Sequence, residues 1–250
     1  MKWGILMSRK QIKFNKKVKK NITLVAFGDS FVEGFIKSPK ENTKKDREKI
    51  NFITKLCTLD NPFVKCENYG IHGASNEKIA YRVYKRCKSS VQNCFFLICW
   101  SHHDRVSYFH HANDEYQTDI NLLKATRKNN TFQTTMFMFG LHNMLTYLQI
   151  PHAQINSFSP LIKNHKLDYA VAANYINAEY DRNTLFDIIA NRYKKEIPLR
   201  HDDYSHPENF DFEFNDYITK CYHPTASGHT LIAKTLNPLL KRYYELHFSR

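Results

Sequence analysis

The residues best suited to chemistry lie near the two ends of the chain. Ser30 follows Gly28 and Asp29 directly after the apolar run 24–27. Such a run predicts a buried strand, and a serine at the tip of a strand-to-helix turn is a common position for a nucleophile. His223, in the sequence Tyr-His-Pro-Thr, offers an imidazole that could accept the serine proton. The two side chains together predict acyl transfer, in which Ser30 attacks an ester carbonyl.

Each of these residues also has a purely structural interpretation. Asp29 or Ser30 would cap the helix that follows, as Asp and Ser often do. His223 would be an ordinary loop residue in a chain that has 13 histidines. A second histidine, His229, lies six residues further on and is another candidate base.

The two motifs resemble those of the SGNH (GDSL-type) hydrolase family. The resemblance runs from Val25 to about Leu240 and is carried by Gly-Asp-Ser near the amino terminus and His-Pro near the carboxyl terminus. It implies that Ser30 is the nucleophile and His223 the base. In that family a second histidine after the glycine, here His229, often takes no part in catalysis, so we favour His223.

An oxyanion hole requires hydrogen-bond donors near the nucleophile. We expect the backbone N–H of Ser30 to be one donor, and the resemblance implies that Gly73 provides another. Gly73 is also interpretable as a turn glycine with positive φ, and the two interpretations are compatible. The third motif of the family provides an asparagine, which this chain lacks, so we expect Ser101 or His102 to donate instead.

The acid that would orient the base is not evident. The family usually has an aspartate three residues before the histidine, where this chain has Lys220. A lysine disfavours the imidazolium that must form. Either Ser30 and His223 act as a dyad, or another acid such as Asp216 or Asp211 takes the role. The alternative is a weakened or inactive protein of this fold that serves as a glycan-binding or structural module.

A metal site is also conceivable after the third predicted strand. Adjacent histidines point in different directions, and the spacing matches no metal signature. We therefore expect no metal and no cofactor, and expect these residues to line the mouth of the site, where Arg105 could meet an anionic substrate. The five side chains concerned are His102, His103, Asp104, His110 and His111.

Alternating strands and helices must position these residues. The pattern predicts an α/β fold, a three-layer α/β/α sandwich with a mostly parallel, about five-stranded sheet, and the resemblance implies the flavodoxin-like form of that fold. Arg200–Asp216 is expected to be a loop. We predict strands at 22–27, 62–69, 93–100 and 151–158, and helices at 49–57, 77–88, 116–128, 131–150, 184–189 and 227–247.

Length and charge limit the classes of function. A chain of 250 residues, 42% of them hydrophobic, can bury the core of one domain, which we place at 21–250 after a basic, poorly ordered leader at 1–20. The net charge of +13 favours an anionic partner, but the lysines concentrate in 13–20 and 37–49, as in solvated segments. We therefore expect an ester substrate, either a small molecule or a glycan O-acetyl group, and consider nucleic acid unfavoured.

The remaining features concern redox state and membranes. Six cysteines without Cys-x-x-Cys spacing predict reduced thiols. The first seven residues do not resemble a signal peptide, so we expect a cytoplasmic protein. The stretch 129–162 has no charged residue, but its many polar groups favour a buried core helix over a transmembrane segment.

Overall fold

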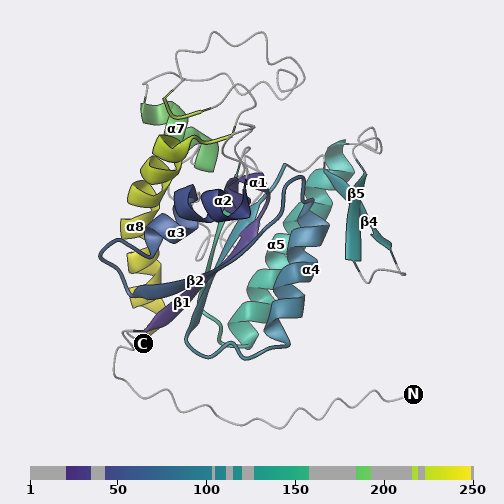
Figure 1. Ribbon diagram of the computed structural model, residues 1–250. Coiled ribbons are helices and arrows are strands. Elements are labelled where there is room, and N and C mark those ends of the chain that lie inside the picture. The colour runs from purple at the N-terminus through teal and green to yellow at the C-terminus, as the bar shows by residue number, and fades with distance from the viewer. Residues whose placement is uncertain are drawn as a thin grey trace, which may run out of the picture.

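A four-stranded parallel sheet forms the centre of the computed structural model (Figure 1). Its strands follow the order β2-β1-β3-β6. They are β1 (Ile22–Gly28), β2 (Phe63–Gly70), β3 (Cys94–Trp100) and β6 (His152–Asn156). The structure describes residues 21–34, 43–102, 105–110, 115–119, 127–157, 184–192, 216–218 and 223–248.

The two central strands are buried on both faces, as their largely apolar sequences predict. Their side chains enter two cores. One core lies against helices α1, α3, α7 and α8, and the other lies against α4 and α5 (Figure 1). The predicted three-layer α/β/α arrangement is thereby confirmed, with four strands in the described sheet.

Polar caps begin several of the helices. Asp29 caps α1 (Ser30–Glu33), Asn51 caps α3 (Phe52–Leu56) and Ser75 caps α4 (Asn76–Cys87). Asn51 has an extended backbone (ψ 151°), so the single helix predicted at 49–57 is divided into α2 and α3. The other helices are α2 (Lys44–Ile50), α5 (Arg127–Tyr147), α7 (Leu185–Arg192) and α8 (Ala226–Phe248).

The prediction of a helix at 116–128 is wrong. Strands β4 (Val106–His110) and β5 (Glu115–Asp119) form an antiparallel hairpin instead, and α5 begins only at Arg127. Pairing with β4 therefore determines the conformation of this stretch.

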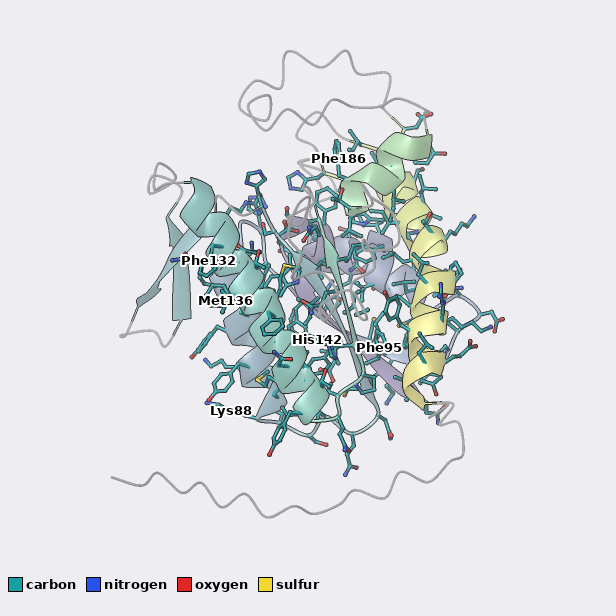
Figure 2. All side chains as sticks on the ribbon, turned by 180° about the vertical axis from the view of Figure 1, so that it is seen from behind. Lys88, Phe95, Phe132, Met136, His142 and Phe186 are labelled. Atoms are coloured by element: carbon teal, nitrogen blue, oxygen red, sulfur yellow. The ribbon has the colours of Figure 1, made fainter. Side chains whose placement is uncertain are left out.

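Helix α5 is buried on one side only. Met138, Leu141 and Leu145 pack in the core, whereas Phe132 and Tyr147 are 63% and 75% exposed. Figure 2 labels Phe132 and Met136 on this helix, and Met136 is also exposed. The predicted core helix is therefore a half-exposed surface helix. Within the described ranges, no helix is both long enough and apolar enough to cross a membrane.

Some predictions fall outside the described residues. The leader 1–20, most of the loop 200–216, and Cys221 belong to this group. The structure describes five cysteines as free thiols, of which Cys94 and Cys99 are buried and the other three are partly buried.

Candidate active site

Ser30 is the first residue of α1, immediately after the turn that follows β1, at the carboxyl edge of the sheet. In the order β2-β1-β3-β6, β2 lies on one side of β1, and β3 and β6 lie on the other. The strand order therefore reverses between β1 and β3, and such switch points are where open α/β sheets bind ligands. Gly28 allows the strand to approach its neighbours, because a Cβ there would lie 2.3 Å from Val32 Cγ2 and 3.0 Å from the carbonyl oxygen of Cys99. Ser30 has no exposed surface.

The imidazole of His223 lies directly beside the serine. Its Nε2 atom is 2.9 Å from Ser30 Oγ, within hydrogen-bonding distance. The loop that carries His223 is held by the N–H of Thr225, which donates to the Tyr217 carbonyl at 3.0 Å. Gly228 completes this contact, since a Cβ there would lie 2.1 Å from the same carbonyl oxygen. The structure therefore brings together the two residues that the end motifs indicated.

His229 lies in the core and away from the serine. Its ring stacks on Phe52 with centroids 6.1 Å apart, and neither ring nitrogen has a hydrogen-bond partner in the described structure. Burial, with smaller contributions from Lys55 and His223, lowers the pKa of His229 to about 3. A histidine in this environment stays neutral and does not contact Ser30.

The carboxylate of Asp29 is the centre of a buried network beneath the serine. It accepts hydrogen bonds from the N–H of Phe31 at 3.1 Å, from the Ser101 hydroxyl at 3.0 Å and from the Ser157 hydroxyl at 3.2 Å. Arg105 Nη1 lies 3.3 Å from Asp29 Oδ2. Burial raises the pKa of Asp29, while Arg105 and the three hydrogen bonds act in the opposite direction. The network fixes the turn that presents Ser30.

This network changes the interpretation of two predicted residues. Arg105 was expected to meet an anionic substrate, but its guanidinium contacts Asp29 and the Ser101 hydroxyl, the latter at 2.8 Å. The Ser101 hydroxyl donates its proton to Asp29, so it is not directed toward an oxyanion at Ser30. His102, the alternative donor, is half-buried next to it and stays a prediction.

Two supporting residues were missed from the sequence. Asn76, the first residue of α4, accepts the N–H of Ser101 at 2.8 Å and donates to the Ser101 carbonyl at 3.2 Å. Ser157 follows β6 directly, as Ser101 follows β3. Polar residues immediately after buried strands were the available signal, because the carboxyl ends of parallel strands meet at one edge of the sheet.

The loop that contains Gly73 lies beside the base. The N–H of Ala74 donates to the Ile71 carbonyl at 3.1 Å, and Gly73 has φ +71°, as the third residue of a type II turn requires. The N–H of His72 donates to Glu33 Oε2 at 2.6 Å, which connects the loop to the end of α1. The rings of His72 and His223 have centroids 5.8 Å apart. The oxyanion role of Gly73 stays a prediction.

The orienting acid is not assigned by these contacts. Asp216 is exposed, and its carbonyl oxygen, not its carboxylate, accepts a hydrogen bond from Thr225 Oγ1 at 2.6 Å. Lys220 and Asp211 lie outside the described residues. The same holds for three of the five residues considered for a metal, His103, Asp104 and His111. Within the described part of the chain, no cluster of three or more metal-binding side chains occurs.

A parallel α/β/α sandwich with a serine and a histidine at its switch point defines a class of hydrolases. The family model of GDSL-like lipases and acylhydrolases matches residues 24–236, so the chain belongs to this family. No curated protein matches the chain.

Several solved structures are similar in overall fold. A member of the lipolytic G-D-S-L family from Veillonella parvula has 14% identity and a TM-score of 0.43, with 88% of this chain and 99% of that chain covered. The acetyl xylan esterase AlAXEase has 13% identity and a TM-score of 0.47, with 88% of this chain and 100% of that chain covered. A catalytic mutant of the acetylxylan esterase Axe2 from Geobacillus stearothermophilus also has 13% identity and a TM-score of 0.47, with 92% of this chain and 94% of that chain covered.

Proposed function

We propose that the protein is a serine esterase that cleaves carboxylic esters through an acyl-enzyme on Ser30. The observation that carries the proposal is the 2.9 Å distance between His223 Nε2 and Ser30 Oγ. His223 takes the hydroxyl proton as Oγ attacks the carbonyl carbon, and it returns the proton to the leaving alcohol. Water, activated by the same imidazole, then releases the acid. The N–H groups of Ser30 and Gly73 stabilise the oxyanion.

The preferred substrate class is the O-acetyl ester of a carbohydrate. Ser30 is fully buried, and the Phe31 ring lies 6.2 Å from the His223 ring, centroid to centroid. Such an enclosed serine favours a small acyl group over a long one. The exposed His72 beside the base provides a ring on which a sugar could stack.

Labelling with a fluorophosphonate probe, read out by intact mass, tests the esterase function. We expect a single adduct on the wild-type protein and none on Ser30→Ala. His223→Ala should slow labelling by about 10²–10⁴-fold, the usual contribution of a general base. Ser90→Ala, which changes an exposed serine near the end of α4, is the matched control and should label at the wild-type rate.

The opposite result has a specific meaning. Folded wild-type protein without an adduct would contradict the esterase proposal. The protein would then be better described as the alternative, a glycan-binding module that keeps the fold but lacks an activated serine.

A further inference from the structure

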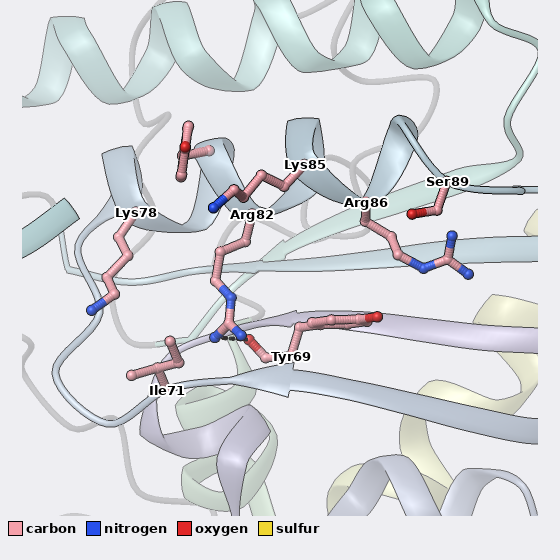
Figure 3. Close-up of a pocket in the computed structure, with 8 residues that line it drawn as sticks. Tyr69, Ile71, Lys78, Arg82, Lys85, Arg86 and Ser89 are labelled. Carbon is pink, nitrogen blue, oxygen red and sulfur yellow. Dashed lines mark hydrogen bonds between the residues drawn. The ribbon is translucent and has the colours of Figure 1, made fainter. Parts of the chain in front are cut away.

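A cavity of about 320 Å³ lies between helix α4 and strand β2 (Figure 3). Strand β2 is the first in the order β2-β1-β3-β6, so its outer side has no partner within that sheet. Among the eight lining residues are four cations and no carboxylate. The cations are Lys78, Arg82, Lys85 and Arg86, and we call this cavity the α4–β2 groove.

The cations are distributed along the length of the groove. From Lys78 to Arg86 the helix advances by eight residues, or about 12 Å at its usual rise. Figure 3 shows Lys78 and Ile71 at one end of the groove and Arg86 and Ser89 at the other. A single small anion cannot touch all four charges, whereas a chain with repeated negative charges can.

Two arginines in the groove are fixed by neighbouring groups. Arg82 Nη1 donates to the Tyr69 carbonyl at 3.3 Å, and its guanidinium lies 5.6 Å from the centroid of the Tyr69 ring. Arg86 forms a two-point ion pair with Glu67, at 2.9 and 3.2 Å, which compensates its charge. Lys85 Nζ lies 5.1 Å from the centroid of the Tyr81 ring, so this cation is also positioned by a neighbouring side chain. A fixed guanidinium loses little conformational entropy when an anion binds.

The groove ends beside the candidate active site. Ile71 lines it, and the next residue, His72, has its ring 5.8 Å from that of the base His223. Lys78 belongs to the first turn of α4, which begins directly after the loop that contains Gly73. A chain bound in the groove would therefore extend toward Ser30.

We infer that the α4–β2 groove binds an acidic polysaccharide and directs its ester groups toward Ser30. The site itself follows from the geometry, while the assignment of its ligand as the substrate rests on the proposed esterase function. A polysaccharide carries acyl esters on its hydroxyl groups and carboxylates along its chain. A nucleic acid would match the charge, but its backbone offers no carboxylic ester. The Tyr69 ring supports the groove from below: it stacks on Phe27 with centroids 5.2 Å apart, and Arg82 lies over the ring, 5.6 Å from its centroid.

The test measures binding in the full-length Ser30→Ala variant, so it does not depend on catalysis. The probes are oligogalacturonate, a neutral xylo-oligosaccharide and a single-stranded oligodeoxynucleotide, each titrated by calorimetry at low and moderate salt. The groove variant is Lys78→Glu with Lys85→Glu. The matched control is Lys88→Glu, at an exposed lysine that caps the same helix and does not line the groove.

We expect oligogalacturonate to bind and the neutral oligosaccharide not to bind. The groove variant should weaken oligogalacturonate binding by at least about tenfold, as expected when like charges face the ligand, and Lys88→Glu by less than about twofold. Added salt should weaken binding. A second measurement uses protein that retains Ser30. There, the groove substitutions should lower the ratio of kcat/KM on acetylated pectin to kcat/KM on acetylated xylan.

Three results would overturn the inference. They are no binding of oligogalacturonate, an equal loss in Lys88→Glu and the groove variant, and tighter binding of the oligonucleotide through the same lysines. A failure of serine labelling alone would leave the binding result intact, so the two proposals fail separately.

Discussion

Two histidines six residues apart have opposite environments. His223 contacts Ser30 through Nε2, whereas His229 is enclosed in the core with two ring nitrogens that lack hydrogen bonds in the described structure. Gly228 and the cap of Thr225 on α8 set this arrangement, because His223 precedes the helix and His229 lies in its first turns. The different positions of the two histidines, one before α8 and one in its first turn, therefore make one a candidate base and the other a core residue.

The burial of His229 predicts an acid-sensitive fold. Its folded-state pKa of about 3 lies below the ordinary value near 6.5, so between these values the unfolded chain binds a proton that the folded protein does not. The stability from neutral His229 is complete above pH 6.5 and falls by about 1.4 kcal/mol per pH unit as the pH decreases toward 3. His229→Leu should remove this part of the pH dependence.

Urea unfolding at pH 7.5 and pH 5 measures the effect. At pH 7.5 the variant should match the wild type within about 1.5 kcal/mol, because leucine is apolar and of similar volume. Between pH 7.5 and pH 5, the wild type should lose about 2 kcal/mol more free energy of unfolding than His229→Leu. Parallel pH curves for the two proteins would show that folding does not lower the pKa of His229.

At the scale of the elements, the contact between β2 and α1 controls the position of the serine. A Cβ on Gly70 would lie 2.2 Å from Glu33 N and 2.6 Å from Val32 C, both backbone atoms of α1. Gly70→Ala must displace this short helix, whose first residue is Ser30. We expect a loss of about 1–3 kcal/mol of stability and slower probe labelling.

Gly140→Ala is the matched control for that substitution. Gly140 lies exposed in α5, and a Cβ there would meet no atom within 4 Å. The same chemical change should stabilise the protein by about 0.5–1 kcal/mol, because alanine restricts the unfolded chain. Denaturant unfolding and labelling rates of both variants decide the matter. Equal effects at the two positions would mean that the α1 contact is not tight.

The elements also show what sequence alone could predict. The strands β1 and β3 are largely apolar, and α4 and α8 begin at clear caps, so their positions were predicted to within about two residues. The hairpin β4–β5 was missed because each strand has only five residues and β5 is mostly polar, and its pairing with β4 outweighs local propensity. Asn51 divided a predicted helix by capping the second half.

The candidate site could be predicted only where a motif carried it. Ser30 and His223 stand in recognisable sequences, and the structure places them in contact. The partners of Asp29 come from positions 101, 105 and 157, far apart in the chain, and no local pattern connects them. The α4–β2 groove likewise depends on how helix and edge strand pack, although the lysines and arginines of α4 are visible in the sequence.

At the scale of the whole molecule, one sheet separates two cores that share no layer of helices. Neighbouring residues of β1 and β3 point alternately into the two cores. Ile22 belongs to the core that includes residues of α3 and α8, whereas Ile98 belongs to the core that includes residues of α4 and α5. Because both strands serve both cores, loss of packing on one face must loosen the backbone on which the other face depends. We therefore expect the two cores to unfold in one transition.

Ile22→Val and Ile98→Val test this coupling with the same small change on opposite faces. Trp100 lies in the Ile98 core, where its indole N–H donates to Gln154 Oε1 at 2.8 Å, and Trp3→Phe makes it the only tryptophan. Each variant should lose about 0.5–1.5 kcal/mol, and Trp100 fluorescence and far-UV circular dichroism should give the same loss. Val64→Ala, on the exposed side of β2, should lose less than about 0.5 kcal/mol. If Ile22→Val shifted the circular dichroism transition and left Trp100 fluorescence unchanged, the two faces would unfold independently, and the sheet would not transmit packing between them.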